Sequence, residues 1–245
     1  MRGPVADGRV VAMRATTSSL ITALCVLTLL GCTSTGPTAP DPSATAGTGD
    51  AALTASPAQT PAADVPAEVM LPAAAWADIT PDDVREDSAG VVGWRVPESC
   101  DAGNPADGAM RTVTQGSGEL ESRVGVHQVA VLADADAAVT EADRLAAALT
   151  ACTQRVSDDA TVYVVEPLAV GAQGVGLATD YYGDTVEGAL DDAMGTYLTV
   201  TRRGNAITLV AVEGGEGTVG TARETATTNA QAAWELLCTY DSAGC

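Results

Sequence analysis

The apolar and polar residues of this 245-residue chain follow three different patterns from one end to the other. Residues 20–30 are an uncharged, apolar run. Residues 33–67 are mostly Pro, Ala, Thr, Ser and Gly, and from residue 68 onward apolar residues recur at the spacings of strands and helices. These patterns predict one folded domain, residues 68–245, preceded by a disordered linker, because the composition of 33–67 cannot bury enough surface to fold.

Several runs of β-branched and apolar residues, bounded by Gly, Pro and Asn, predict strands. Among them are 91–96, 195–203 and 206–213. The dipeptide Gly204-Asn205 joins the last two runs and is typical of a two-residue hairpin turn. In the register of that turn Val200 pairs with Leu209, so alternate residues share one face of the sheet. That face carries Leu198, Val200, Ile207, Leu209 and Ala211.

Two longer stretches have apolar residues at helical spacing. The first follows Asp134, a residue that can cap a helix start, and ends at Cys152. In the second, residues 218–240, the repeating side chains are mostly Ala, which would let a helix approach a sheet closely. We therefore expect an α+β fold, an antiparallel sheet of about six strands with two main helices packed on one face.

The opposite face of the hairpin is the candidate ligand-binding surface. It carries Tyr197, Val210 and Val212 among several threonines. Such a face is too apolar to be fully hydrated and too rich in hydroxyls for a deep core. With both helices on the other side of the sheet, we expect these three residues to line an open, partly apolar groove.

The beginning of the chain has the features of a bacterial lipoprotein leader. Arg14 precedes the apolar run of 20–30, which is too short to span a bilayer as a helix, and the run leads into Leu29-Leu30-Gly31-Cys32. That tetrapeptide resembles a lipobox, in which cleavage leaves the cysteine as an acylated first residue. We expect residues 1–31 to be a signal peptide and Cys32, carrying palmitate-like chains, to anchor the domain to the extracytoplasmic face of the cell membrane through residues 32–67.

The charge of the chain limits its possible partners. All 12 basic residues are Arg, against 32 acidic residues, and loss of residues 1–31 would leave nine basic and 31 acidic ones, a net charge of −22. A surface this negative repels phosphate backbones and anionic lipid head groups. We therefore expect no nucleic-acid partner, and attachment to the membrane only through the lipid on Cys32.

Four cysteines would remain in the mature domain, and an even number in an oxidising compartment predicts two disulfides. They are Cys100, Cys152, Cys238 and Cys245. Three connectivities are possible, of which we favour Cys100–Cys152 and Cys238–Cys245. A zinc site is the competing interpretation, but no C-x-x-C pair is present and we expect no metal.

Candidate catalytic groups are few, and no nucleotide, haem, flavin or other cofactor motif is present. His127, the single histidine, could serve a hydrolase, but it lies in the middle of an expected strand, and Gly116-Ser117-Gly118 does not match the G-x-S-x-G motif. Carboxylates between two expected strands could hold Ca²⁺, but their spacing fits no EF-hand and a solvated acidic loop is the better interpretation. They are Asp180, Asp184, Glu187, Asp191 and Asp192.

The layout of the domain resembles that of the PknH-like extracellular sensor domain family, which occurs in actinobacteria behind receptor kinases and as free lipoproteins. The resemblance rests on residues 71–76, Trp94 with Cys100, the run from His127 to Cys152, Arg203-Gly204-Asn205, and a last helix ending at Cys238. It implies two disulfides and a cleft for an unidentified ligand.

We therefore expect a cell-envelope lipoprotein with a non-enzymatic, sensor-like or ligand-binding domain that takes an unknown small molecule. One alternative is a structural or interaction protein that binds another envelope protein through its acidic loop, in which case partner capture would depend on salt and on Asp191 and Asp192. A second alternative is an esterase-like hydrolase that depends on His127.

Overall fold

The structure is a computed structural model that describes residues 64–80, 84–153, 160–186 and 188–245. The expected signal peptide, Cys32 and most of the expected linker lie outside these ranges, as does Glu187. Among the described residues, no helix has the length and apolar character needed to cross a membrane. The packed part of the chain begins slightly before the expected boundary at residue 68, because Val65 is already buried.

Seven antiparallel strands form one sheet in the order β1-β2-β3-β7-β6-β5-β4. The strands are β1 (Arg85–Ala89), β2 (Ala109–Gln115), β3 (Val124–Val131), β4 (Val162–Pro167), β5 (Ala172–Asp180), β6 (Gly195–Arg203) and β7 (Ala206–Glu213). The two long helices are α1 (Ala135–Cys152) and α2 (Val219–Leu236), and the remaining helical elements are short 3-10 turns. The α+β class is confirmed, with seven strands where about six were expected.

The first strand differs from the expected one. Residues 85–89 pair with β2 although they are polar, whereas the apolar run 91–96 leaves the sheet and crosses the face that carries α1. An edge strand bonds to one neighbour only and needs no apolar face, so the backbone pairing of 85–89 is not visible in an alternation pattern. The apolar residue Trp94 of the crossing segment is buried against the core beneath α1.

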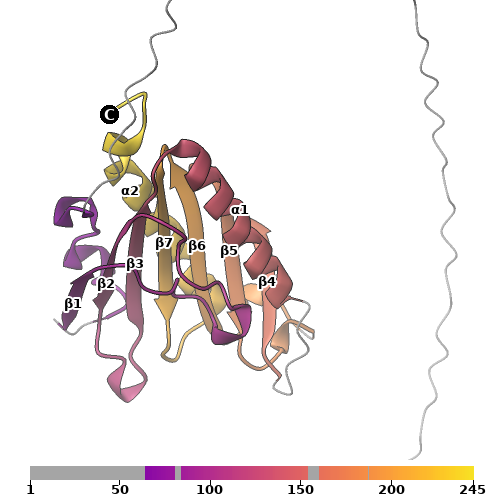
Figure 1. The fold of residues 1–245 in the computed structure, drawn as a ribbon. Helices are drawn as coiled ribbons and strands as arrows, with labels where there is room; N and C mark the ends of the chain where they lie inside the picture. Colours follow the sequence, from indigo (N-terminus) through magenta and orange to yellow (C-terminus); the bar gives the residue numbers. More distant parts are fainter. Residues whose placement is uncertain (1–63, 81–83, 154–159, 187) are drawn as a thin grey trace, which may run out of the picture. The chain divides into compact units, whose positions relative to one another are not determined.

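The helices cover opposite faces of the sheet, which corrects the expectation that both lie on one face (Figure 1). Helix α1 packs on Leu198, Leu209 and their neighbours, while α2 packs on Val210 and Val212. The reason lies in the central strand: seven of the eight residues of β7 are buried, so both of its faces require a cover. The result is a three-layer arrangement of helix, sheet and helix.

The small side chains of α2 bring it close to the sheet, as the sequence pattern predicted. Four alanines of the helix are fully buried in the cluster that also holds Trp76 and Tyr197. Thr218 caps the helix by accepting the N–H of Thr221 at 3.3 Å. The observed pairing of β6 with β7, including Val200 with Leu209, is the predicted register.

Two disulfides close the domain, Cys100–Cys152 and Cys238–Cys245. This is the connectivity that we favoured. The first joins the end of α1 to the segment that crosses its face of the sheet, and the second closes a short loop after α2. Both therefore fix segments that have no strand partner.

Candidate ligand-binding cleft

The groove expected at Tyr197, Val210 and Val212 does not exist as an open surface. Their exposed fractions are 2%, 0% and 1%, and all three belong to the cluster beneath α2. The prediction was wrong because it placed α2 on the other face of the sheet. The same alternation that grouped these residues now assigns them to the α2 interface.

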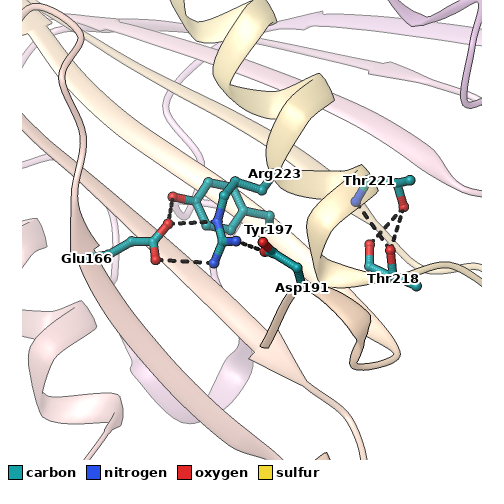
Figure 2. A network of polar contacts seen from close by, with 6 residues as sticks. All are labelled: Glu166, Asp191, Tyr197, Thr218, Thr221 and Arg223. Atoms are coloured by element: carbon teal, nitrogen blue, oxygen red, sulfur yellow. Dashed lines mark hydrogen bonds and ion pairs between the residues drawn. The ribbon is translucent and has the colours of Figure 1, made fainter. Parts of the chain in front are cut away.

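The polar groups on this covered face bond to one another (Figure 2). The Tyr197 hydroxyl donates to Glu166 at 2.6 Å, and the Arg223 guanidinium bonds to Glu166 and Asp191 and lies 5.2 Å from the centre of the Tyr197 ring. Burial and the adjacent Glu166 carboxylate both raise the pKa of Tyr197. Since Gly176 has no Cβ, the Tyr197 ring can lie across β5 to reach Glu166. This network joins α2 to β4, β6 and the 190–192 turn, and it is a structural link.

An open cleft of about 610 Å³ lies on the α1 face instead, where β4 to β7 extend beyond α1. The crossing segment 94–98 forms one wall and the strands form the floor. A volume of this size is within the usual range of small-molecule sites. Tyr197 and Val212 border it as well, but their side chains belong to the other face, so only their main chain can reach the cleft.

The strand register arranges the floor in rows. Leu177 pairs with Leu198 and Leu198 with Ala211, which gives an apolar row across β5, β6 and β7. One step toward the ends of the strands, Tyr163 pairs with Thr179 and Thr179 with Thr196, which gives a row of hydroxyls across β4, β5 and β6. The cleft therefore changes from apolar to polar along the strands.

The wall opposite these rows is held by buried polar side chains. Gln128 on β3 accepts the Arg95 N–H at 2.7 Å and donates to the Gly93 carbonyl at 3.1 Å. The Trp94 indole donates to Glu141 of α1 at 2.9 Å. Together with the Cys100–Cys152 disulfide, these bonds fix the position of the wall, so the cleft is formed before any ligand binds.

Charge at the cleft is confined to its mouth. Arg95 and Glu213 form an ion pair at 2.5 Å, and the Glu213 hydrogen bond raises the pKa of Arg95. Glu98, the other charged residue of the lining, is exposed. Burial is the main cause of a raised pKa at Tyr181, so its phenol is protonated at neutral pH. The groups available to a ligand are thus hydroxyls, aromatic rings and one internally paired ion pair.

His127 has no place in this cleft. It is fully buried on the α2 face, where Nδ1 accepts the Leu71 N–H at 3.0 Å and Nε2 lies 2.9 Å from the Thr208 hydroxyl. Nδ1 is therefore the acceptor and the proton is on Nε2, which can donate to Thr208. Burial lowers the pKa of His127 to about 3. With both nitrogens bonded inside the core, His127 connects the 65–71 segment to the sheet and cannot reach a substrate.

Some carboxylates of the expected acidic loop are bonded to other groups of the protein and are not free in solvent. Asp180 is buried and accepts the N–H groups of Tyr182, Gly183 and Thr185. Burial acts to raise its pKa, but the hydrogen bonds from Thr185 and Tyr182 outweigh it and lower the pKa. Asp191 pairs with Arg223, and Asp192 is exposed. Within the described ranges, no three His, Cys, Asp or Glu side chains are grouped closely enough to hold a metal ion.

Sequence reasoning missed the lining of the cleft. The hydroxyl row becomes visible only when the pairing of β4, β5 and β6 is known, since Tyr163, Thr179 and Thr196 are far apart along the chain. A signal was nevertheless present. Thr179 lies two positions from Leu177 on one strand, and Thr196 lies two positions from Leu198 on the next, so each threonine is on the same face of the sheet as its apolar neighbour.

Comparison with known proteins gives a weak likeness of fold. The extracellular domain of PknH from Mycobacterium tuberculosis matches with a TM-score of 0.45 and 10% sequence identity, over 68% of this chain and 93% of that chain. No protein-family model matches the sequence, and no curated protein matches it either. The likeness concerns the fold at a coarse level, and membership of the PknH-like sensor family stays a prediction.

Proposed function

We propose that this protein is an extracytoplasmic lipoprotein whose domain binds a small ligand, without catalysis, in the cleft between segment 94–98 and β4 to β7. The single observation that carries the proposal is the open cleft itself, with its fixed wall and its floor graded from apolar to hydroxyl-bearing. A cleft that is already formed binds without an ordering cost, which favours recognition of a small molecule.

Two further features support an extracytoplasmic, tethered domain. The two disulfides suit an oxidising compartment. The segment that follows the expected linker packs beside Ala206, at one end of β7, whereas the cleft lies at Glu213, the other end of the same strand. These ends are about 23 Å apart at roughly 3.3 Å per residue, so the described part of the chain enters the domain away from the cleft.

Native mass spectrometry of the full chain, incubated with envelope extract from its own host, tests this proposal. We expect a discrete added mass that is absent from a Thr196→Trp variant, because a large ring at Thr196 fills the cleft. The matched control is Thr228→Trp on the exposed side of α2, which should keep the added mass. A bare mass for the unmodified protein, or an equal adduct on the Thr196→Trp variant, would contradict ligand binding in this cleft and favour the protein-interaction alternative.

A further inference from the structure

The side chains that a ligand would touch in the cleft are rings and hydroxyls more than aliphatic groups. The apolar row of the floor is almost completely covered, since Leu177, Leu198 and Ala211 are all buried in the core. The half-buried residues that stand above them are different in kind. They are Val96, Pro97, Thr161, Tyr163, Tyr181 and Thr196. A purely aliphatic ligand would therefore meet little aliphatic surface.

The hydroxyls of this set can act in both directions. A Thr or Tyr hydroxyl donates one hydrogen bond and accepts others, so it matches a partner that is itself a hydroxyl. Tyr163 already shows this capacity, because its oxygen accepts the Ser99 hydroxyl at 2.8 Å while its own hydrogen can still be donated. Thr179 and Thr196 follow it on the two neighbouring strands, and Thr161 lies just before its own strand.

The charges at the mouth argue against an anionic ligand. Arg95 is the one cation of the lining, and it is engaged by Glu213 at 2.5 Å. Binding a carboxylate or phosphate would require Arg95 to leave Glu213, in a protein whose expected net charge without residues 1–31 is −22. A cationic ligand would find its only unpaired carboxylate of the lining at Glu98, which is exposed and solvated.

From these observations we infer that the cleft binds an uncharged carbohydrate, with the faces of its sugar rings against Tyr163 and Tyr181 and its hydroxyls against those of Tyr163 and Thr196, the two ends of the hydroxyl row. Sugar rings have an apolar C–H face and a polar hydroxyl edge, and the cleft presents surfaces for both. This inference rests on the proposed function and specifies its ligand.

Saturation-transfer NMR on the full chain, solubilised in a zwitterionic detergent that contains no sugar, tests the inference. The probes are glucose, N-acetylglucosamine, mannose, maltose, cellobiose and trehalose, with glucuronic acid, glucose 6-phosphate and glucosamine as charged counterparts. We expect at least one neutral saccharide to bind, about tenfold or more tightly than any charged counterpart. Absence of binding by every neutral saccharide, or tighter binding of a charged one, would overturn the assignment.

Two matched pairs of variants locate the binding. Tyr181→Ala removes a ring from the lining and should abolish the signal, whereas Tyr181→Phe keeps the ring and should retain most of it. Thr196→Val keeps the shape of the side chain without its hydroxyl and should weaken binding about tenfold, while Thr228→Val on the exposed side of α2 should have no effect. Equal binding by all four variants would overturn the assignment to this cleft.

The two proposals fail in different ways. If the envelope extract yields an adduct that Thr196→Trp removes but no neutral saccharide binds, then ligand binding in the cleft stands and the carbohydrate assignment is wrong. If neither the extract nor any saccharide binds, both are wrong.

Discussion

Acidification is expected to weaken the fold through His127 at a pH where most carboxylates are still ionised. The ring is fully buried, and its pKa falls from 6.5 to about 3 in the folded protein. In the unfolded chain the ring titrates near 6.5, so between pH 6.5 and 3 the unfolded state holds a proton that the folded state does not. The stability contributed by the neutral ring is therefore complete above pH 6.5 and is lost progressively as the pH falls toward 3.

The size of this effect follows from the shift. Each pH unit below 6.5 costs about 1.4 kcal/mol of unfolding free energy, so a fall from pH 7 to pH 5 should remove about 2 kcal/mol. Desolvation is the main cause of the depressed pKa, with the positive charge of Arg85 as a second one. A carboxylate such as Asp180, whose pKa is lowered by its N–H donors, adds its own loss only at lower pH.

Urea unfolding of the full chain with its disulfides intact, followed by tryptophan fluorescence, measures this slope between pH 7 and 5. The control is His127→Gln, which cannot titrate. We expect it to be about 1–3 kcal/mol less stable at pH 7, because a flexible amide does not reproduce the geometry of the ring's bonds to Leu71 and Thr208, but to show little change down to pH 5. The reasoning would be refuted by an unfolding free energy of the unmodified protein that is constant from pH 7 to 5, or by an equal slope in the variant.

Three further predictions concern the anchor and the links between segments. Cys32→Ser should move the protein from the detergent-extracted membrane fraction to the soluble fraction of the cell envelope, measured by immunoblot, and unchanged fractionation would contradict lipid anchoring at Cys32. Glu166→Gln should cost about 1–2 kcal/mol of unfolding free energy, since Glu166 accepts from both Tyr197 and Arg223, whereas Asp191→Asn should cost less than about 1 kcal/mol because its side chain is 62% exposed. Urea titrations that rank these two variants in the opposite order would show that the network is not centred on Glu166. Replacing both cysteines of the pair Cys100–Cys152, which closes a loop of 52 residues, should cost about 4 kcal/mol of unfolding free energy. Replacing both cysteines of the pair Cys238–Cys245, which closes a loop of 7 residues, should cost about 2 kcal/mol. An equal loss for the two pairs in thermal or urea unfolding would contradict this dependence on loop length.

The parts of the fold that could be predicted from sequence are those set by neighbours along the chain. The Gly204-Asn205 turn and the alternation on either side of it predicted the register of β6 and β7, because a two-residue turn leaves one pairing only. The alanine stripe of α2 was equally clear, since every member of it from Ala222 to Ala233 is buried. Local periodicity determines both features.

The faces of the helices could not be predicted in the same way. Alternation divides a strand into two faces but does not say which helix covers each of them, and the face with Thr199, Thr201 and Thr208 resembled a partly exposed one. In the structure these threonines are buried, and the hydroxyls of Thr199 and Thr201 donate to main-chain carbonyls. A threonine can be buried at little cost when a carbonyl is within reach, but that carbonyl belongs to a distant part of the chain.

The cleft lies where the sheet is wider than the helix and the segment that cover its α1 face. Seven strands spaced about 4.8 Å apart give a sheet roughly 29 Å wide, whereas a helix with its side chains is only about 10 Å across. On the α2 face the segment with Leu71 and Trp76 covers part of the area that the helix leaves, and Asn229 of α2 fixes it by donating to the Ala75 carbonyl at 2.9 Å.

On the α1 face the crossing segment covers part of the sheet in the same way and borders the cleft where β4 and β6 begin and β5 and β7 end. Its buried attachment points are Gln128 on β3, Glu141 on α1 and the disulfide at Cys152, whereas at the strand ends it is joined by the Arg95–Glu213 ion pair and the Ser99–Tyr163 hydrogen bond. The segment therefore borders an open cleft at that corner, in which Tyr163 and Thr196 are half-buried and Thr179, between them in the hydroxyl row, is buried. Hydroxyls at Tyr163 and Thr196, in place of the aliphatic residues one step further into the sheet, suit a partly exposed and hydrated surface. A chain with Val or Leu at those three positions would have an aliphatic cleft instead, so the threonines and the tyrosine there support the proposal that the cleft takes a polar ligand.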